Sequence, residues 1–135
     1  MHTETLKQTI AQIFATGKGL LAADESNASV HKRFEALNIP QTEEKRLAYR
    51  TLLVGTPDVN KYISGIIFYD ETLRQEIAPG KTFSTYCTEN GIVPGIKVDK
   101  GLIDLPNFPE EKLTLGLDGL KERLEEYYAL GARFT

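Results

Sequence analysis

The sequence has little of the residue types that build disulfides and metal centres. Its 135 residues include one cysteine, two histidines and no tryptophan. A single cysteine excludes an internal disulfide and a multi-cysteine metal site, so we interpret Cys87 as a small buried apolar side chain. His2 lies in the terminus, and His31 has no carboxylate at metal-ligand spacing, which argues against a zinc site. We therefore expect no metal centre.

Long apolar runs and a strong charge of either sign are also missing. No apolar run approaches the roughly 20 residues that span a membrane, and residues 1–8 lack the apolar segment of a secretory signal. The net charge of −3 provides no electrostatic footprint for nucleic acid or an anionic membrane. We expect a cytoplasmic protein with neither nucleic acid nor membrane as a partner. An anionic ligand would have to be held by a local cluster of basic side chains.

The apolar pattern predicts strands and helices in alternation. Short apolar runs between turn residues predict strands at 20–24, 62–69 and 92–98, although Pro94 weakens the last of them. Amphipathic periodicity predicts helices at 3–16, 29–37, 42–54 and 118–130, with shorter helical turns at 71–77 and 83–89. Nothing resembles a hairpin, residues 101–116 indicate a loop, and residues 132–135 indicate the start of a fourth strand. This order predicts an α/β fold with a parallel sheet, in a single domain over residues 1–135.

The densest chemistry lies between Gly17 and Arg33. A short apolar run ends there on Asp24 and Glu25, and a helix pattern follows. In α/β folds, a charged residue between a strand and the next helix is a common position for catalytic groups. Two hydroxyls at a helix start, with two cations one turn further along, suit a phosphate. The residues concerned are Ser26, Ser29, Lys32 and Arg33. A capping serine beside two solvated basic residues explains the same pattern.

A lysine near the end of the third predicted strand is another candidate for a functional group. Lys97 shares a strand face with Gly95 and is expected at the tip of a strand adjacent to that of Asp24. A lysine on an inward face requires a counter-charge or a ligand, because burying it alone costs several kcal/mol. Asp24 and Lys97 are therefore either a functional pair or a structural ion pair at the sheet rim. Glu71, at the end of the second predicted strand, is either an acid–base group or a helix cap.

Six ordered segments resemble class I fructose-bisphosphate aldolase, from about Leu6 to Thr135. They are G-K-G-L-L-A-A-D-E-S, K-R, T-E-E-K-R-L-A-Y-R, G-I-I-F-Y-D-E-T-L, G-I-K-V-D-K-G and G-L-D-G-L-K-E-R. The resemblance implies a (β/α)8 TIM-barrel enzyme of glycolysis and gluconeogenesis. Such an enzyme reversibly cleaves fructose 1,6-bisphosphate to dihydroxyacetone phosphate and glyceraldehyde 3-phosphate. It works through a lysine Schiff base, without metal or other cofactor, and the full-length enzyme is expected to be a homo-oligomer.

The resemblance also implies roles for individual residues. Asp24 would be the active-site aspartate that assists proton transfer, and Lys97 the active-site lysine of the third strand beside it. The sugar phosphate would be bound by Ser26, Ser29, Lys32 and Arg33. Asn27 and Ala28 depart from the commonest S-T-G-S pattern, and alanine adopts a positive φ less readily than glycine.

The family's Schiff-base lysine belongs to the sixth strand, beyond Thr135. The resemblance therefore covers an N-terminal portion: about three βα units and the start of a fourth strand. We expect this chain to be inactive alone. Two alternatives remain open, a non-catalytic phosphate-binding half-barrel that needs a partner chain and a Schiff-base aldolase for another sugar phosphate.

Overall fold

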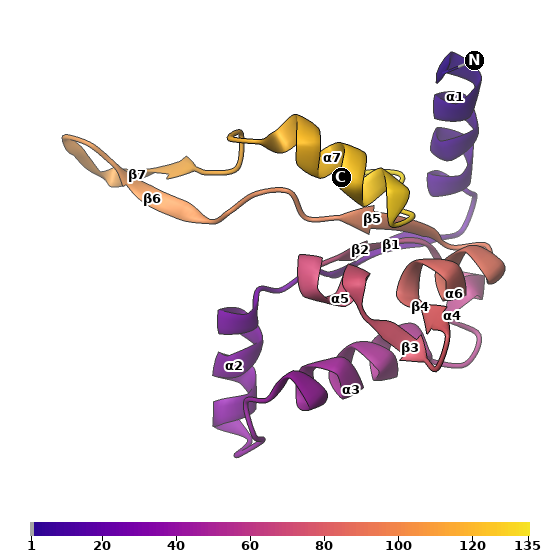
Figure 1. The fold of residues 1–135 in the computed structure, drawn as a ribbon, viewed down its shortest axis with the longest axis horizontal. Helices are drawn as coiled ribbons and strands as arrows, with labels where there is room; N and C mark the ends of the chain where they lie inside the picture. The colour runs from indigo at the N-terminus through magenta and orange to yellow at the C-terminus, as the bar shows by residue number, and fades with distance from the viewer. Residues whose placement is uncertain (1) are drawn as a thin grey trace.

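The computed structural model describes residues 2–135. The main sheet has three parallel strands, and helices pack around it (Figure 1). The strands lie in the order β1 (Gly19–Ala23), β2 (Ile63–Phe68) and β5 (Val93–Ile96). All three predicted strands are confirmed, with bounds one to two residues from those expected. Gly65 pairs with Leu20 on one side and Val93 on the other, which places β2 in the middle.

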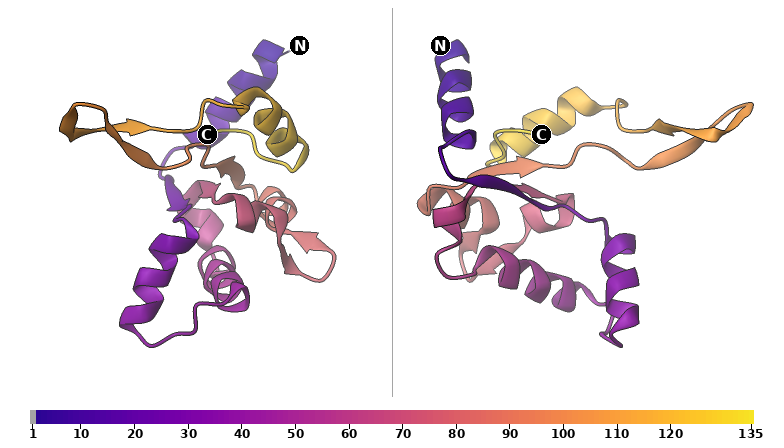
Figure 2. Two further views of the ribbon diagram at one scale, coloured as in Figure 1. Left: turned by 60° about the vertical axis from the view of Figure 1, so that its left-hand side comes forward. Right: turned by 180° about the vertical axis from the view of Figure 1, so that it is seen from behind.

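Seven helices are assigned within residues 2–135. They are α1 (His2–Ile13), α2 (Asn27–Ala36), α3 (Glu43–Val54), α4 (Val59–Tyr62), α5 (Asp70–Arg74), α6 (Phe83–Glu89) and α7 (Leu120–Ala129). The short α4 was not predicted, and α5 ends three residues before the predicted limit. None of the helices described is long and apolar enough to cross a membrane. Figure 2 shows α2 and α3 together at one end of the molecule, away from α7.

The buried core lies between the sheet and the helices that follow its strands. Strand residues Ala23, Ile66, Phe68 and Ile96 contribute one wall. The helices contribute Val54, Leu73, Phe83, Cys87 and Tyr127. Cys87 is fully buried, as predicted, and burial raises the pKa of its thiol to about 12. The thiol is therefore a packing group in this core.

Local capping signals explain where two of the helices begin. As the first residue of the helix predicted at 42–54, Thr42 is the expected N-cap of α3, and its hydroxyl accepts a hydrogen bond from the Lys45 amide, which confirms this cap. Ser26 caps α2 in the same way, so that helix starts two residues earlier than predicted. As the first residue of the helix predicted at 118–130, Asp118 is the expected N-cap of α7, and this expectation is wrong. Gly119, at φ 63°, precedes α7 without any side-chain cap.

The expectation of no hairpin is wrong, because two antiparallel hairpins interrupt the alternation. One joins β3 (Glu76–Ala78) to β4 (Lys81–Thr82). The other joins β6 (Leu102–Leu105) to β7 (Phe108–Thr114), within the segment predicted to be a loop, and extends away from the sheet (Figure 1). Gly80 and Asn107 adopt positive φ at the two turns. The second hairpin escaped prediction because β7 is exposed along its whole length and has no buried face.

The opposite face of the sheet is covered by one aromatic ring where glycines leave room. Phe134 forms an isolated parallel bridge with Gly95, where the sequence predicted a fourth strand. A Cβ atom on Gly95 would lie 2.6 Å from the Phe134 ring, so only glycine permits this approach. Pro94 fits in β5, and its carbonyl accepts the Arg133 amide at 2.8 Å. Leu20, on the same face, is 47% exposed.

Candidate functional site

The candidate site begins where the three parallel strands end. Ala23, Phe68 and Ile96 form the last paired row across the sheet. The next residue of each strand supplies Asp24, Tyr69 and Lys97, and the Lys97 amide still donates to the Phe68 carbonyl at 2.9 Å. Carboxyl ends of parallel strands are the usual place for chemistry in α/β folds.

The prediction that Asp24 and Lys97 lie on adjacent strands is wrong. The middle strand β2 separates β1 from β5. Two strand spacings place their backbones about 10 Å apart. Tyr69 lies between them in the row and was missed, although its place at the end of a predicted strand could have indicated it.

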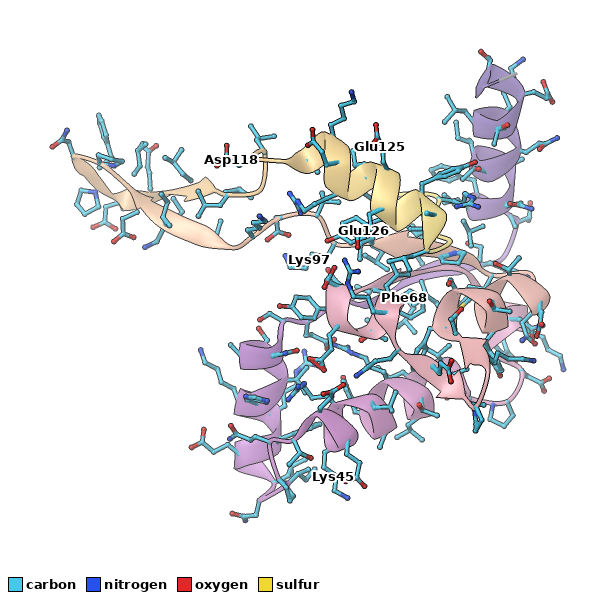
Figure 3. All side chains as sticks on the ribbon, in the orientation of Figure 1. Lys45, Phe68, Lys97, Asp118, Glu125 and Glu126 are labelled. Atoms are coloured by element: carbon cyan, nitrogen blue, oxygen red, sulfur yellow. The ribbon has the colours of Figure 1, made fainter. Side chains whose placement is uncertain are left out.

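One cavity of about 980 Å³ nevertheless brings four of the predicted site residues together. Asp24, Ser26, Ser29 and Lys97 all line it, whereas Lys32 and Arg33 are not among its lining residues. Helices α5 and α7 contribute further lining residues, together with the segment 99–102 and Thr114. Figure 3 shows Lys97 in the space between these helices, which Glu126 of α7 also lines.

The two candidate catalytic side chains differ in how they are held. Lys97 forms an ion pair with Asp99, and the hydrogen bond from Lys97 holds the pKa of the Asp99 carboxyl below its ordinary value. The Gly101 amide also donates to Asp99 at 3.0 Å. Asp24 is half-buried and forms no side-chain hydrogen bond or ion pair within residues 2–135. Its carboxylate is therefore available to a ligand in the cavity.

The two serines meet at the first turn of α2. Their hydroxyls lie 3.2 Å apart, and Ser26 Oγ accepts the Ser29 amide at 3.3 Å. Arg33, two turns further along, instead pairs with Glu25 and donates to the Tyr49 hydroxyl at 3.0 Å. Its side chain is 58% exposed.

Glu25 anchors the junction between β1 and α2 to α3. Arg50 pairs with its carboxylate and also donates to its backbone carbonyl at 2.6 Å. Burial alone would raise the pKa of Glu25, but hydrogen bonding and the charges of Arg50 and Arg33 outweigh it, and the pKa is lowered. Glu25 is thus held ionised, with two arginines and Tyr49 around it.

Two arginines that line the cavity connect elements around it. Arg74 joins Asp70 at 2.9 Å to Glu126 at 2.6 Å, which ties α5 to α7. Arg123 donates to the backbone carbonyls of Val98 and Gly116. Sequence reasoning assigned no site role to these residues. The acidic residue Asp70 directly follows the predicted strand 62–69 and was a usable signal, whereas the arginine contacts depend on elements distant in sequence.

We predict that the stability of this chain falls in acid. The pKa values of Glu25 and Asp99 are lowered from ordinary values of 4.5 and 3.8. The stabilisation from a lowered carboxyl pKa is fully present above the ordinary value and is lost as pH falls through the folded-state value. Urea unfolding at a series of pH values should show a free energy of unfolding that declines below about pH 5. The E25Q variant should show a shallower decline; an equal slope would contradict the assignment to Glu25.

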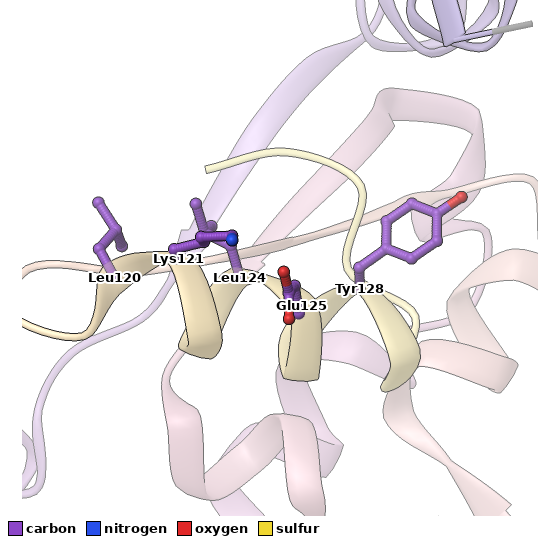
Figure 4. A pocket seen from close by; sticks show the side chains of 5 residues that line it. All are labelled: Leu120, Lys121, Leu124, Glu125 and Tyr128. Atoms are coloured by element: carbon purple, nitrogen blue, oxygen red, sulfur yellow. The ribbon is translucent and has the colours of Figure 1, made fainter.

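A second hollow lies on the outer side of α7 and contains none of the predicted site residues (Figure 4). It is lined by Leu120, Lys121, Leu124, Glu125 and Tyr128. The sequence predicts a buried stripe of Leu120 and Leu124 with Tyr127 or Tyr128. Tyr127 is buried, but Leu124 is 38% and Tyr128 58% exposed. The stripe is therefore confirmed only at Tyr127.

Comparison with known proteins identifies the family of this chain. The family model for fructose-bisphosphate aldolase class-I matches residues 5–135. A probable fructose-bisphosphate aldolase class 1 of Xanthomonas campestris pv. campestris is 52% identical over 135 residues, covering 100% of this chain and 40% of the relative. Fructose-bisphosphate aldolase 2 of Plasmodium berghei is 49% identical over 132 residues, covering 98% of this chain and 36% of the relative.

A solved structure extends the similarity to three dimensions. It is a Plasmodium falciparum fructose-bisphosphate aldolase in complex with TRAP and a small-molecule inhibitor. It superposes with a TM-score of 0.91 at 48% identity, over 97% of this chain and 38% of that chain. The fold therefore agrees with part of a (β/α)8 barrel. The chain spans about 40% of the length of the relatives it matches. Together, the family model, the relatives and the shared fold show that the chain belongs to the class I fructose-bisphosphate aldolase family.

Proposed function

We propose that this chain forms one side of the sugar-phosphate site of a class I fructose-bisphosphate aldolase. The observation that carries the proposal is the cavity at the carboxyl ends of three parallel strands, lined by Asp24, Ser26, Ser29 and Lys97. In this proposal residues 1–135 are a single incomplete domain, with the first three βα units and the start of the fourth strand of the barrel. The reaction served is the reversible cleavage of fructose 1,6-bisphosphate.

The two catalytic candidates act from opposite sides of the cavity. The unpaired Asp24 carboxylate accepts a hydrogen bond from a substrate hydroxyl and takes or returns a proton near the reacting carbon. Lys97, oriented by Asp99, donates hydrogen bonds to substrate oxygens and offsets developing negative charge. We do not assign the Schiff-base nucleophile to Lys97. The chain alone is accordingly expected to bind substrate without turning it over.

The phosphate is bound in this proposal at the start of α2. Ser26 and Ser29 supply hydroxyls at the cavity wall, and Lys32 and Arg33 supply positive charge from the next turns. To bind the phosphate, Arg33 must give up its ion pair with Glu25. An exposed ion pair contributes only about 0–1 kcal/mol, so a phosphate dianion can compete with it. Glu25 keeps its buried partner Arg50 after the exchange.

Titration calorimetry with fructose 1,6-bisphosphate tests the proposal. The wild-type chain should bind, and K97M and R33M should each weaken binding by about tenfold, as expected for loss of one charge-assisted hydrogen bond. K61M is the matched control, because Lys61 is 63% exposed, pairs with Asp58 and lies outside the cavity. A panel of other sugar phosphates tests substrate preference.

Two experimental results would contradict the proposal, one from calorimetry and one from borohydride trapping. No binding by the wild-type chain, or equal binding by K97M and K61M, would contradict the proposed site. Borohydride reduction in the presence of substrate should trap no covalent adduct. A trapped adduct would contradict the statement that the Schiff-base lysine lies outside this chain.

A further inference from the structure

Besides the cluster around Glu25, a second cluster of polar side chains is centred on Glu71, next to the candidate phosphate-binding turn. Asn27 Nδ2 donates to Glu71 Oε2 at 2.6 Å, joining the first residue of α2 to α5. Arg46 of α3 holds the same carboxylate, with Nε 2.9 Å from Oε1 and Nη2 2.9 Å from Oε2. His31 Nε2 lies 2.9 Å from Arg46 Nη1. Three helices therefore meet at one carboxylate.

This carboxylate is fixed and does not line the cavity. The side chains of Arg46 and Glu71 are only 14% and 21% exposed. Burial alone would raise the pKa of Glu71, but the hydrogen bonds from Arg46 and Asn27 outweigh it and lower the pKa. Glu71 is not among the cavity-lining residues. Glu71 therefore contacts the cavity-lining turn indirectly, through its hydrogen bond to Asn27.

The position of Asn27 makes this contact relevant to binding. It stands between Ser26, the N-cap of α2, and Ser29, and both serines line the cavity. Glu25, the residue before Ser26, is held by Arg50. Arg50 lies one helical turn after Arg46 on α3. The turn is thus tethered on both sides of Ser26, by two acids and two arginines of one helix. A turn held in this way is preorganised, which reduces the ordering cost of binding.

We propose that Glu71 is a positioning residue for the sugar phosphate, holding the Ser26–Ser29 turn through its hydrogen bond to Asn27. The inference rests on the proposed function, in which this turn binds the phosphate. A positioning role and a purely electrostatic role of Glu71 predict opposite changes in anion affinity when the carboxylate is removed. Removing a carboxylate near an anion site should strengthen anion binding by reducing repulsion. Removing a positioning group should weaken it.

Four variants and one control variant test the proposal on the 135-residue chain, with fructose 1,6-bisphosphate as the probe. E71A and N27A should each weaken binding about tenfold, the effect of one charged hydrogen bond. E71Q keeps an acceptor for Asn27 and should stay within about threefold of wild type. The double variant E71A/N27A should bind no more weakly than either single variant, because both remove the same contact. E89Q, which disrupts the exposed Lys81–Glu89 pair, is the matched control and should bind as wild type.

Amide hydrogen exchange supplies a readout that needs no ligand. The Val30 amide donates to the Ser26 carbonyl at 3.0 Å, so its protection reports on the turn. E71A and N27A should speed exchange at Ser29 and Val30 while the amides of β2 remain protected. Unchanged exchange in both variants, tighter binding by E71A, or additive losses in the double variant would overturn the inference. If wild type fails to bind the sugar phosphate, the proposed function fails, and exchange at Val30 still decides whether Glu71 positions the turn.

Discussion

Replacing Arg50 by methionine should destabilise the chain by about 3 kcal/mol, because breaking a buried ion pair leaves a charge without its partner. The Arg50 side chain is only 3% exposed. It binds both the carboxylate and the backbone carbonyl of Glu25. Methionine fills most of the same space, so the loss comes from a Glu25 carboxylate and backbone carbonyl without their buried partner, and not from a cavity. Urea unfolding followed by circular dichroism measures the change in the free energy of unfolding.

Arg33 offers a control on the same acid. It also pairs with Glu25, but its side chain is 58% exposed. R33M should therefore lower the free energy of unfolding by less than about 1 kcal/mol, the usual contribution of a solvent-exposed ion pair. Equal losses from R50M and R33M would show that burial does not decide the strength of these pairs.

Replacing Phe68 by alanine should destabilise the chain by about 4 kcal/mol, the usual cost of removing a buried aromatic ring from a core. Phe68 is fully buried in the middle strand, and its ring meets Phe83 edge-on at 5.8 Å. The Phe68 carbonyl also accepts the Lys97 amide, so loosening this strand end should disturb the candidate site. Thermal and urea unfolding both measure the effect.

Phe108 is the matched control for this truncation. It lies on the hairpin that extends from the sheet and is 56% exposed. F108A should change the free energy of unfolding by no more than about 0.5 kcal/mol, as for most surface substitutions. A loss comparable to that of F68A would mean that the hairpin is packed in solution, contrary to the structure.

The floor of the candidate site is an apolar sheet, and its rim is held by ion pairs between elements. Arg74 ties α5 to α7, and Arg50 ties α3 to the end of β1. The rim thus places polar groups at the strand ends without relying on loop rigidity. Such tethers suit a site that has to hold a charged substrate in one orientation.

Several parts of the fold were predictable because their signals are local. The three strands are short apolar runs, and the N-cap of α3 depends on Thr42 and the residues directly after it. Helix α6 was predicted with its observed bounds of 83–89. Asp24, Ser26, Ser29 and Lys97 were identified from their places at strand ends and a helix start, and one cavity unites them.

Other parts depended on distances that no local pattern contains. The order of the strands places β2 between Asp24 and Lys97. The exposure of Leu124 and Tyr128 depends on what α7 meets and not on its periodicity. The partners of Glu25 and Glu71 lie 25 residues away at Arg50 and Arg46, and Asn27 lies 44 residues from Glu71.

By itself, the sequence determined the α/β alternation, the family resemblance and the candidate residues of the site, because each of these depends on side chains that are neighbours in the sequence. The tertiary structure alone decided which charges meet, which strand lies in the middle and which serines and lysines share a cavity. The physical reason is that ion pairs and cavities form between elements. Their geometry exists only after the parallel sheet has brought distant segments to one edge.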